Sequence, residues 1–364
     1  MYLGVMSGTS MDAVDLAVVD FNGARPSLVT TASSAWPQGL LERLRAFAGG
    51  TRLDAHAVAV LDTEVGLHIA TAINTLLHDS AIASGAIHAI GSHGQTVAHA
   101  PGEIPPTTLQ LGDANVIAEA TGIRTINDFR RRDVAAGGQG APLAPAFHAA
   151  TLRDADEDRV VLNLGGIANI TVLPADLAAP VIGFDTGPAN CLMDYWASHH
   201  LDQAYDQAGA WAAGGTVDAQ LLQRLLDDPY FDLSPPKSTG TQYFSPAWLQ
   251  RRLTGSAARP EDVQATLLAL TAESVAAAVT RFAPSAVRIL VCGGGVHNTA
   301  LMRYLARTLN RPVESSAAYG IDPDWMEAMA FAWLAMRTCE GLAGNLPSVT
   351  AAAGERILGA IHPA

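Results

Sequence analysis

The chain has 364 residues, of which 49% are hydrophobic and 16% charged, and its formal net charge is −13. This length exceeds one ordinary hydrophobic core, so we expect a soluble, well-packed protein of two domains. The negative charge argues against a nucleic-acid partner, because neutralising phosphates requires clustered Lys and Arg.

The apolar runs are too short, or too interrupted by Gly, Asp and Arg, to span a bilayer, so we expect no membrane partner. The chain opens into a strand without a basic start or a long apolar segment, which favours a cytoplasmic protein over a secreted one. Three cysteines, Cys191, Cys292 and Cys339, form no metal-spaced pair. They are expected to be reduced thiols.

The first 21 residues predict a strand, a turn of glycine and hydroxyl residues, and a second strand. Tyr2 to Met6 and Leu16 to Phe21 are the apolar runs, and the turn begins at Ser7 and Gly8. Backbone amides and hydroxyls in such a turn can bind a phosphate. An ordinary β-hairpin is the alternative.

Two helical patterns, Leu40 to Phe47 and Ala55 to Leu77, precede a buried-type strand at 86–92. That strand ends in His93, Gly94 and Gln95, where an open α/β sheet places ligand-binding groups. A hydrogen-bonded loop histidine is the alternative for His93.

Residues 128–142, DFRRRDVAAGGQGAP, follow a short helix and a short strand and show no periodicity. They predict a long loop, which in a compact protein is usually functional or disordered. Its three consecutive arginines, beginning at Arg130, suit either an anion site or an internal lattice of ion pairs.

Residues 159–174, RVVLNLGGIANITVLP, repeat the opening pattern of strand, glycine turn and strand, here with Gly165 and Gly166. Repetition half a chain apart indicates a duplicated domain, with a cleft between the copies that could grip a nucleotide from both sides.

Asp185 follows an apolar strand and precedes a Gly-Pro turn in VIGFDTGPAN, residues 181–190. A carboxylate held there by rigid turn residues is suited to general-base catalysis, and a helix cap is the alternative.

Residues 287–306 predict a strand, a turn formed by Gly293, Gly294 and Gly295, and a helix, an arrangement that often faces a nucleotide. Residues 322–337 predict a final helix with Glu327 in its first turns. Favourable pairing with the helix dipole is the alternative role for Glu327.

Together these motifs resemble the anhydro-N-acetylmuramic acid kinase family, and the resemblance runs from end to end. The motifs are MSGTSMDAVD (6–15), GSHGQT (91–96), NDFRRRDVAAGGQGAP (127–142), LNLGGIANIT (162–171), GFDTGPAN (183–190), PKSTG (236–240), CGGGVHN (292–298) and DWMEAMAFAWLA (324–335). The resemblance implies an α/β fold with two ribonuclease-H-like domains of the actin and sugar-kinase type, and an ATP cleft between them.

The family's reaction hydrolyses the 1,6-anhydro bond of anhydro-N-acetylmuramic acid and phosphorylates O6 with ATP. The products are N-acetylmuramic acid 6-phosphate and ADP, in the recycling of peptidoglycan. The resemblance implies that Asp185 is the base that activates water. It implies an ATP loop made by Gly8, Thr9, Ser10, Met11, Asp12, Ala13, Val14 and Asp15, to which the glycines at 165, 166 and 293–295 add. Magnesium would neutralise the phosphates, with its ligands left open.

His93, Gln95, Arg130 and Glu327 are the candidates for the sugar side, and an arginine suits the lactyl carboxylate of the substrate. Two alanines depart from the family pattern, Ala13 and Ala189, where the motifs usually have glycine. Each would cost of order 1 kcal/mol if its position requires a positive φ.

We expect an N-terminal ribonuclease-H-like domain at residues 1–145 and a second at 146–340. A tail at 341–364 would pack back on the first domain. The family resemblance also implies a homodimer. The rival functions are another sugar kinase of the same superfamily and, from a different class, an ATP-dependent binding module without catalysis.

Overall fold

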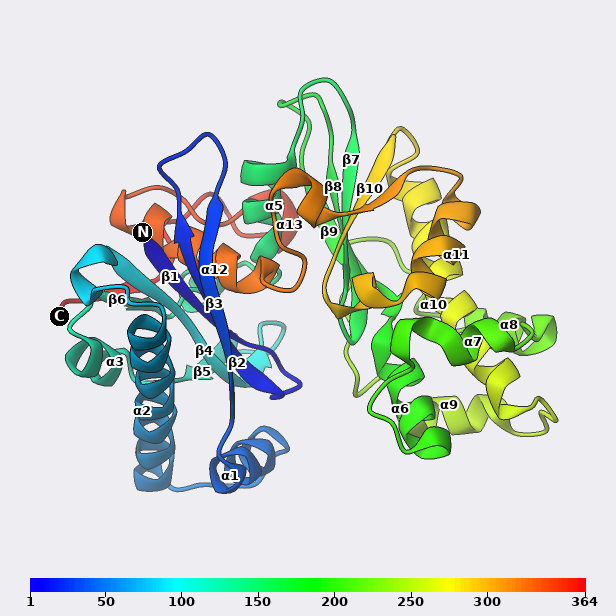
Figure 1. The fold of residues 1–364 in the computed structure, drawn as a ribbon, viewed down its shortest axis with the longest axis horizontal. Coiled ribbons are helices and arrows are strands. Elements are labelled where there is room, and N and C mark those ends of the chain that lie inside the picture. Colours follow the sequence, from blue (N-terminus) through cyan, green and yellow to red (C-terminus); the bar gives the residue numbers. More distant parts are fainter. The chain divides into compact units, whose positions relative to one another are not determined.

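The computed structural model describes all residues, 1–364, and divides the chain into two compact units. Unit 1 contains residues 1–147 and 320–364, and unit 2 contains residues 148–319. Each unit is an α/β structure built on its own sheet (Figure 1).

The elements of unit 1 are β1 (Tyr2–Ser7), β2 (Ala13–Asp20), β3 (Ser27–Ala35), α1 (Gln38–Ala48), α2 (Ala55–Asp79), η1 (Ser84–Ala86), β4 (Ala89–Ala100), β5 (Thr107–Leu111), α3 (Ala114–Thr121), β6 (Thr125–Asn127), α4 (Arg131–Ala135), α12 (Met326–Cys339), α13 (Pro347–Thr350) and β12 (Ala360–His362). Helix α5 (Ala144–Leu152) contains the boundary between the units.

The elements of unit 2 are β7 (Arg159–Leu164), β8 (Ile167–Leu173), β9 (Ile182–Pro188), α6 (Asn190–Leu201), η2 (Gln207–Gly209), α7 (Ala210–Gly214), α8 (Ala219–Leu226), α9 (Pro246–Leu253), α10 (Pro260–Phe282), β10 (Arg288–Cys292), η3 (Gly294–His297), α11 (Thr299–Leu309), β11 (Val313–Ser315) and η4 (Ser316–Tyr319).

The five-stranded sheet of unit 2 repeats the order of five strands in the seven-stranded sheet of unit 1, which adds β12 beside β6 and β5 beside β4. In unit 1 the order β3-β2-β1-β4-β6 has β1 antiparallel to β2 and parallel to β4, and β4 parallel to β6. In unit 2 the order β9-β8-β7-β10-β11 repeats each of these directions. This repeated topology confirms the duplicated α/β fold expected from the two glycine hairpins. The expected ATP cleft between the domains stays a prediction.

Helix α12 belongs to unit 1, although the sequence analysis placed residues 320–340 in the C-terminal domain. The physical reason is close packing of α12 on β1 and β4. A Cβ atom on Gly4 would overlap Ala328 O and lie 2.6 Å from Ala332 N, and one on Gly91 would overlap Phe331 O. Only strands with glycine at these two positions allow the helix backbone to approach so closely.

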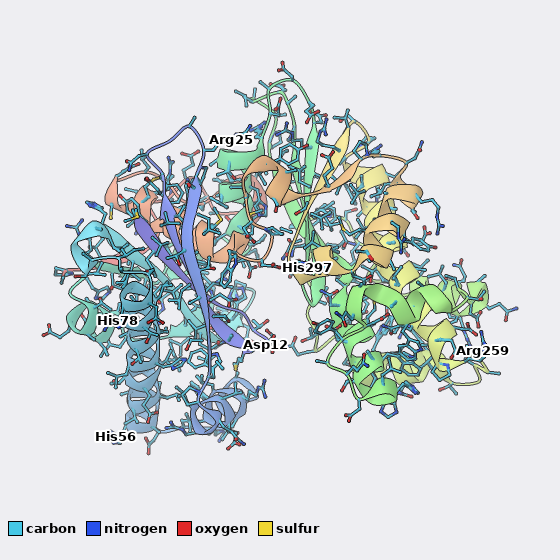
Figure 2. All side chains as sticks on the ribbon, viewed as in Figure 1. Asp12, Arg25, His56, His78, Arg259 and His297 are labelled. Atoms are coloured by element: carbon cyan, nitrogen blue, oxygen red, sulfur yellow. The ribbon has the colours of Figure 1, made fainter.

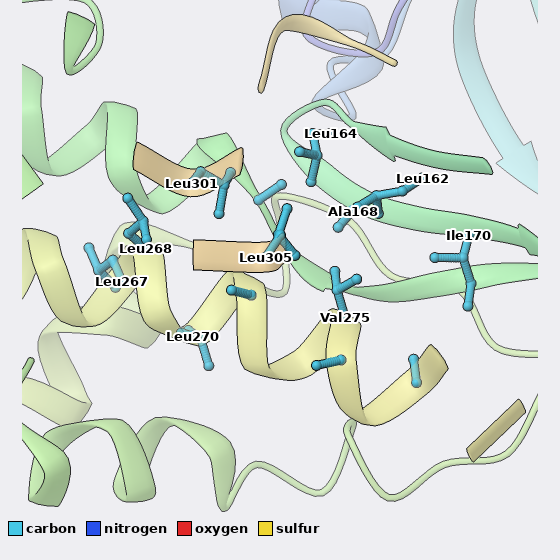
Figure 3. Packing of buried hydrophobic residues seen from close by; sticks show 14 of the residues in the cluster. Leu162, Leu164, Ala168, Ile170, Leu267, Leu268, Leu270, Val275, Leu301 and Leu305 are labelled. Carbon is cyan, nitrogen blue, oxygen red and sulfur yellow. The ribbon is translucent and has the colours of Figure 1, made fainter. Parts of the chain in front are cut away.

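The opposite face of the unit 1 sheet packs on α2. Leu3 and Val5 of β1 form a fully buried cluster with Leu61, Val65 and Ile69, which lie at helical spacing on α2. In unit 2, leucines of α10 and α11 pack against the apolar residues of β7 and β8 (Figure 3). These cores hold the strand ends that carry the polar groups discussed below.

Helix α10 is the one helix long and apolar enough to cross a membrane by length and composition. Its most apolar stretch is 83% buried inside the structure. This is weak evidence for a span, because the core helix of a soluble protein passes the same test.

Several local features differ from the sequence analysis. Strand β3 and helix α5 were not expected, and the loop at 128–142 contains the short helix α4. Strand β4 continues through His93, Gly94 and Gln95 to Ala100, so these residues lie within the strand and not at its end. After β10 the expected glycine turn is present, and Gly294 and Gly295 begin the 3-10 helix η3. Helix α11 begins only after Asn298, whose Oδ1 accepts a hydrogen bond from Leu301 N.

Candidate active site

The first glycine turn is a tight bend between β1 and β2. Met11 N donates to Gly8 O at 3.2 Å, and Met11 takes a left-handed φ of 57°. Thr9, Ser10 and Asp12 are exposed, and Asp12 lies at the tip of the hairpin (Figure 2). The turn therefore presents two hydroxyls and one carboxylate to solvent.

Gln95 holds this turn from the neighbouring strand β4. It is completely buried, its Oε1 lies 2.6 Å from Ser7 Oγ, and its Nε2 donates to Gly8 O at 3.2 Å. Ser7 Oγ also lies 3.1 Å from Ala13 O, the first residue of β2. The oxygen and the nitrogen of the Gln95 amide therefore both form hydrogen bonds with the β1–β2 hairpin.

His93, which is buried, and Arg130, which is half-buried, form a hydrogen-bonded pair 37 residues apart in the chain. Arg130 Nε and Nη2 lie 3.0 and 2.8 Å from His93 Nε2. Because arginine can only donate, Nε2 accepts and the imidazole is neutral. Burial and the Arg130 charge hold the pKa of His93 well below its usual value.

Arg130 also connects this pair to Glu327 at the start of α12. Burial lowers the pKa of Arg130 to about 10, while Glu327 and Asp133 raise it. The pKa of Glu327 is raised overall, because loss of water and the charge of Asp15 raise it more than Arg130 lowers it. Its side chain nevertheless remains accessible to solvent. The structure thus groups His93, Arg130, Glu327 and Asp15 within unit 1.

The arginine loop is fixed by Asp133, a residue that the sequence analysis did not single out. Asp133 is completely buried, and its carboxylate accepts hydrogen bonds from Gly140 N, Asn345 Nδ2 and Thr350 Oγ1 at 2.7, 2.7 and 2.8 Å. The first lies in the same loop, and the other two come from the C-terminal segment. Asp133 therefore ties the loop that carries Arg130 to the end of the chain.

In unit 2 the structure brings the two glycine motifs together. Gly293, with a φ of +79°, follows β10 beside β7, and a Cβ there would lie 2.9 Å from Leu164 O. The carbonyls of Gly165 and Gly166 accept hydrogen bonds from Asn190 N and Ala189 N, each at 3.0 Å. The β7–β8 turn therefore contacts both the triple-glycine turn and the start of α6.

Asp185 lies in β9, the edge strand of the unit 2 sheet, opposite Asn169 of β8. Its Oδ2 accepts a hydrogen bond from Thr239 N at 2.9 Å. Burial raises the pKa of Asp185 to about 6, while the Thr239 N–H and the Lys237 charge lower it. A carboxylate that titrates near 6 is mostly ionised at neutral pH and basic enough to accept a proton in catalysis.

The PKSTG segment at 236–240, which the sequence analysis used only as a family motif, forms the surroundings of this carboxylate. Tyr230 OH donates to Asp185 O at 2.7 Å, and Asp185 N donates to Lys237 O at 3.3 Å. The motif match was the only sequence signal for these contacts, because they join residues 45 or more positions apart.

Neither of the two alanines that replace family glycines has a positive φ. Ala13 is the first residue of β2, pairs with Ala35 and is not among the residues with positive φ. Ala189 has a φ of −115°. Neither alanine therefore carries the penalty considered above.

The comparisons with known proteins agree with these motifs. The family model for anhydro-N-acetylmuramic acid kinase matches residues 1–364. The chain belongs to this family. Two proteins named anhydro-N-acetylmuramic acid kinase are similar to it over its whole length. That of Xylella fastidiosa (strain Temecula1 / ATCC 700964) is 53% identical, with 96% of that protein covered, and that of Xanthomonas axonopodis pv. citri (strain 306) is 55% identical, with 98% covered.

A solved structure, the activator of the 2-hydroxyisocaproyl-CoA dehydratase from Clostridium difficile with bound ADPNP, matches with a TM-score of 0.47 and 14% identity. The match covers 93% of this chain and 96% of that protein. The family and the kinase activity predicted from the motifs are confirmed by the sequence comparisons.

Proposed function

We propose that this kinase opens the 1,6-anhydro bond of anhydro-N-acetylmuramic acid with water and transfers the γ-phosphoryl group of ATP to O6. The observation that carries the proposal is the setting of Asp185, a carboxylate on an edge strand with one oxygen fixed and a pKa of about 6. Such a group can accept the proton of a water molecule at neutral pH.

Asp185 accepts a proton from water as the water oxygen bonds to C1, and the C1–O6 bond breaks. The electron pair released on O6 attacks the γ-phosphorus, and ADP leaves. The proton on Asp185 then passes to solvent. O6 becomes a nucleophile through ring opening, so no second base is needed.

For the sugar side, we propose that Arg130 binds the lactyl carboxylate, with Glu327 and His93 beside it. His93 is neutral, so its hydrogen bonds with Arg130 do not compensate the positive charge of the guanidinium group. His93 also lines a cavity of about 440 Å³, although Arg130 and Glu327 do not line it. Gln95 would act through the hairpin and not by touching the sugar.

For the nucleotide, we propose that residues 8–15 contact the phosphates of ATP and that the glycines at 165, 166 and 293–295 contribute from unit 2. The exposed amide-rich turn supports this role. No group of three His, Cys, Asp or Glu could hold a metal ion by itself. That suits Mg²⁺ that arrives with ATP, which keeps several waters and needs only one or two carboxylates. Asp12 and Asp15 fit that role, and the ion would neutralise charge on the phosphates.

We further propose that the enzyme acts in peptidoglycan recycling as a cytoplasmic homodimer, with no nucleic-acid or membrane partner. The acidic net charge supports the absence of a nucleic-acid partner.

A coupled assay of ADP release tests the proposal with anhydro-N-acetylmuramic acid, N-acetylmuramic acid and N-acetylglucosamine. Turnover is expected with the anhydro sugar alone, and water labelled with ¹⁸O should place the label on C1 of the product. Equal turnover of a sugar without the anhydro bridge, or label absent from C1, would overturn the mechanism.

A further inference from the structure

Residues 230–239 of unit 2, a segment outside the sheet, make three hydrogen bonds to Asp185. Thr239 N binds Oδ2, Tyr230 OH binds the backbone oxygen, and Lys237 O accepts from the backbone nitrogen. Since β9 is an edge strand, this segment takes the place of a further strand beside Asp185. Oδ1 accepts no hydrogen bond from the protein, which leaves it as the oxygen open to water.

The side chain of Lys237 joins the two ends of this segment by hydrogen bonds. Its Nζ donates to Tyr230 O at 3.2 Å and to Phe231 O at 3.4 Å, and it lies 4.6 Å from the centre of the Tyr230 ring. Burial and Arg281 lower the pKa of Lys237, while Asp185 and Asp232 raise it. The ammonium group is therefore coupled electrostatically to Asp185 without forming an ion pair with it.

The base of the segment is anchored by Asp228, which is 3% exposed. Its carboxylate accepts hydrogen bonds from Tyr230 N and Tyr243 OH at 2.9 and 2.7 Å, and from Trp248 Nε1 at 2.9 Å. Arg252 adds an ion pair to the same carboxylate. A segment held this firmly can fix a side chain that it contacts.

The choice of residue at 237 is unusual for this chain. Of its 22 basic residues, Lys237 is the only lysine, and the other 21 are arginines. The lysine ammonium is compact and carries three N–H donors on a flexible stem. The arginine guanidinium is planar and has its donors in a fixed fork, so it would bind two carbonyl oxygens beside an aromatic ring in a different geometry. The only lysine of the chain therefore lies where a compact ammonium group binds two carbonyl oxygens beside the Tyr230 ring.

We propose that Lys237 is a positioning residue for ring opening. Its ammonium group binds the carbonyls of Tyr230 and Phe231 and so fixes the segment whose Thr239 N–H binds Oδ2 of Asp185, which leaves Oδ1 to receive the proton from the attacking water. Its positive charge also favours the ionised form of that carboxylate. This inference rests on the proposed role of Asp185 as the base.

The first experiment measures kcat against pH for the full-length enzyme and for Lys237→Met and Lys237→Arg. Methionine keeps the length of the stem and removes the charge, so the acid limb of the profile should move up by about half to one pH unit. Arginine keeps the charge, so its limb should stay within about 0.2 units of the wild-type position even if its rate falls.

A purely structural role for Lys237 would lower the rate of Lys237→Met equally at every pH, and that result would overturn the inference. An increase in the KM for ATP with an unmoved acid limb would assign Lys237 to the nucleotide and would overturn it as well.

The second experiment does not depend on turnover. Reductive methylation with ¹³C-formaldehyde labels only Lys237 and the N-terminal amine of Met1, and the signal absent from Lys237→Arg identifies Lys237. Its titration by NMR should move to lower pH in Asp185→Asn, because the carboxylate charge that raises the lysine pKa is gone. Identical titrations in the two proteins would overturn the inference.

The two experiments separate this inference from the proposed function. Near-normal turnover of Asp185→Asn would remove Asp185 as the base, whatever the NMR coupling shows. Loss of turnover in that variant, together with an unmoved limb in Lys237→Met, would refute the role of Lys237 alone.

Discussion

The Asp185→Asn substitution is expected to stabilise the fold while it abolishes turnover. The pKa of Asp185 rises from an ordinary value of 3.8 to about 6 on folding, chiefly through burial. Each pH unit of such a shift is worth about 1.4 kcal/mol, so the full difference is about 3 kcal/mol. Because the side chain is partly accessible, we expect about 1–3 kcal/mol.

Because folding raises the pKa of Asp185, ionisation of this residue lowers the stability of the folded state. The folded state binds the proton more tightly than the unfolded state, so ionisation of Asp185 costs nothing below pH 3.8 and the full amount above pH 6. Asparagine removes the charge but still accepts a hydrogen bond from Thr239 N. The stability gain of the variant should therefore grow between pH 4 and 6 and stay constant above pH 6.

Urea unfolding at pH 5, 6, 7 and 8 measures this gain as a shift of the midpoint at unchanged m-value. Asp218→Asn is the matched control, since Asp218 caps α8 through Gln220 N and Leu221 N and asparagine is an equally good cap. We expect the control to change the unfolding free energy by about 0.5 kcal/mol or less. An Asp185→Asn variant that is no more stable than wild type at pH 7 and 8 would refute the burial argument.

Three further outcomes are expected. The wild-type kcat should fall tenfold per pH unit below about pH 6 as Asp185 becomes protonated, and a rate that is flat down to pH 5 would contradict its pKa. Gly4→Ala should lower the free energy of unfolding by about 3 kcal/mol or more, because the backbone of α12 must move, whereas Gly39→Ala, with open space around it, should be neutral or slightly stabilising in the same urea titration. Thr350→Val should cost about 1–3 kcal/mol by taking a donor from buried Asp133, and a smaller loss in thermal or urea unfolding would show that the other donors suffice.

The parts of the fold that the sequence revealed are those encoded locally. Both glycine hairpins and the long helices follow from apolar spacing over a few residues, and the structure contains each of them. The turn expected after Asp185 is absent, because strand β9 continues through Asp185 to Pro188. The repeat of the hairpin pattern also led to the duplicated topology, which the two sheets confirm.

The parts that the sequence did not reveal depend on distant contacts. The placement of α12 depends on Gly4 and Gly91, more than 200 residues earlier, and no local pattern records it. The bond from Thr239 N to Asp185 spans 54 residues. The sequence could name Asp185 through its motif, but the segment that surrounds it became visible only in three dimensions.

The dependence of unit 1 on α12 also sets an order for folding during synthesis. Unit 2 is one continuous stretch, residues 148–319, so its whole chain has been made before α12 begins at Met326. Unit 1 must wait for α12 and then for β12, which pairs with β6 near the end of the chain. Until then one face of β1 and β4 stays uncovered on the ribosome, and this interval is when the nascent chain is most open to aggregation or to capture by a chaperone.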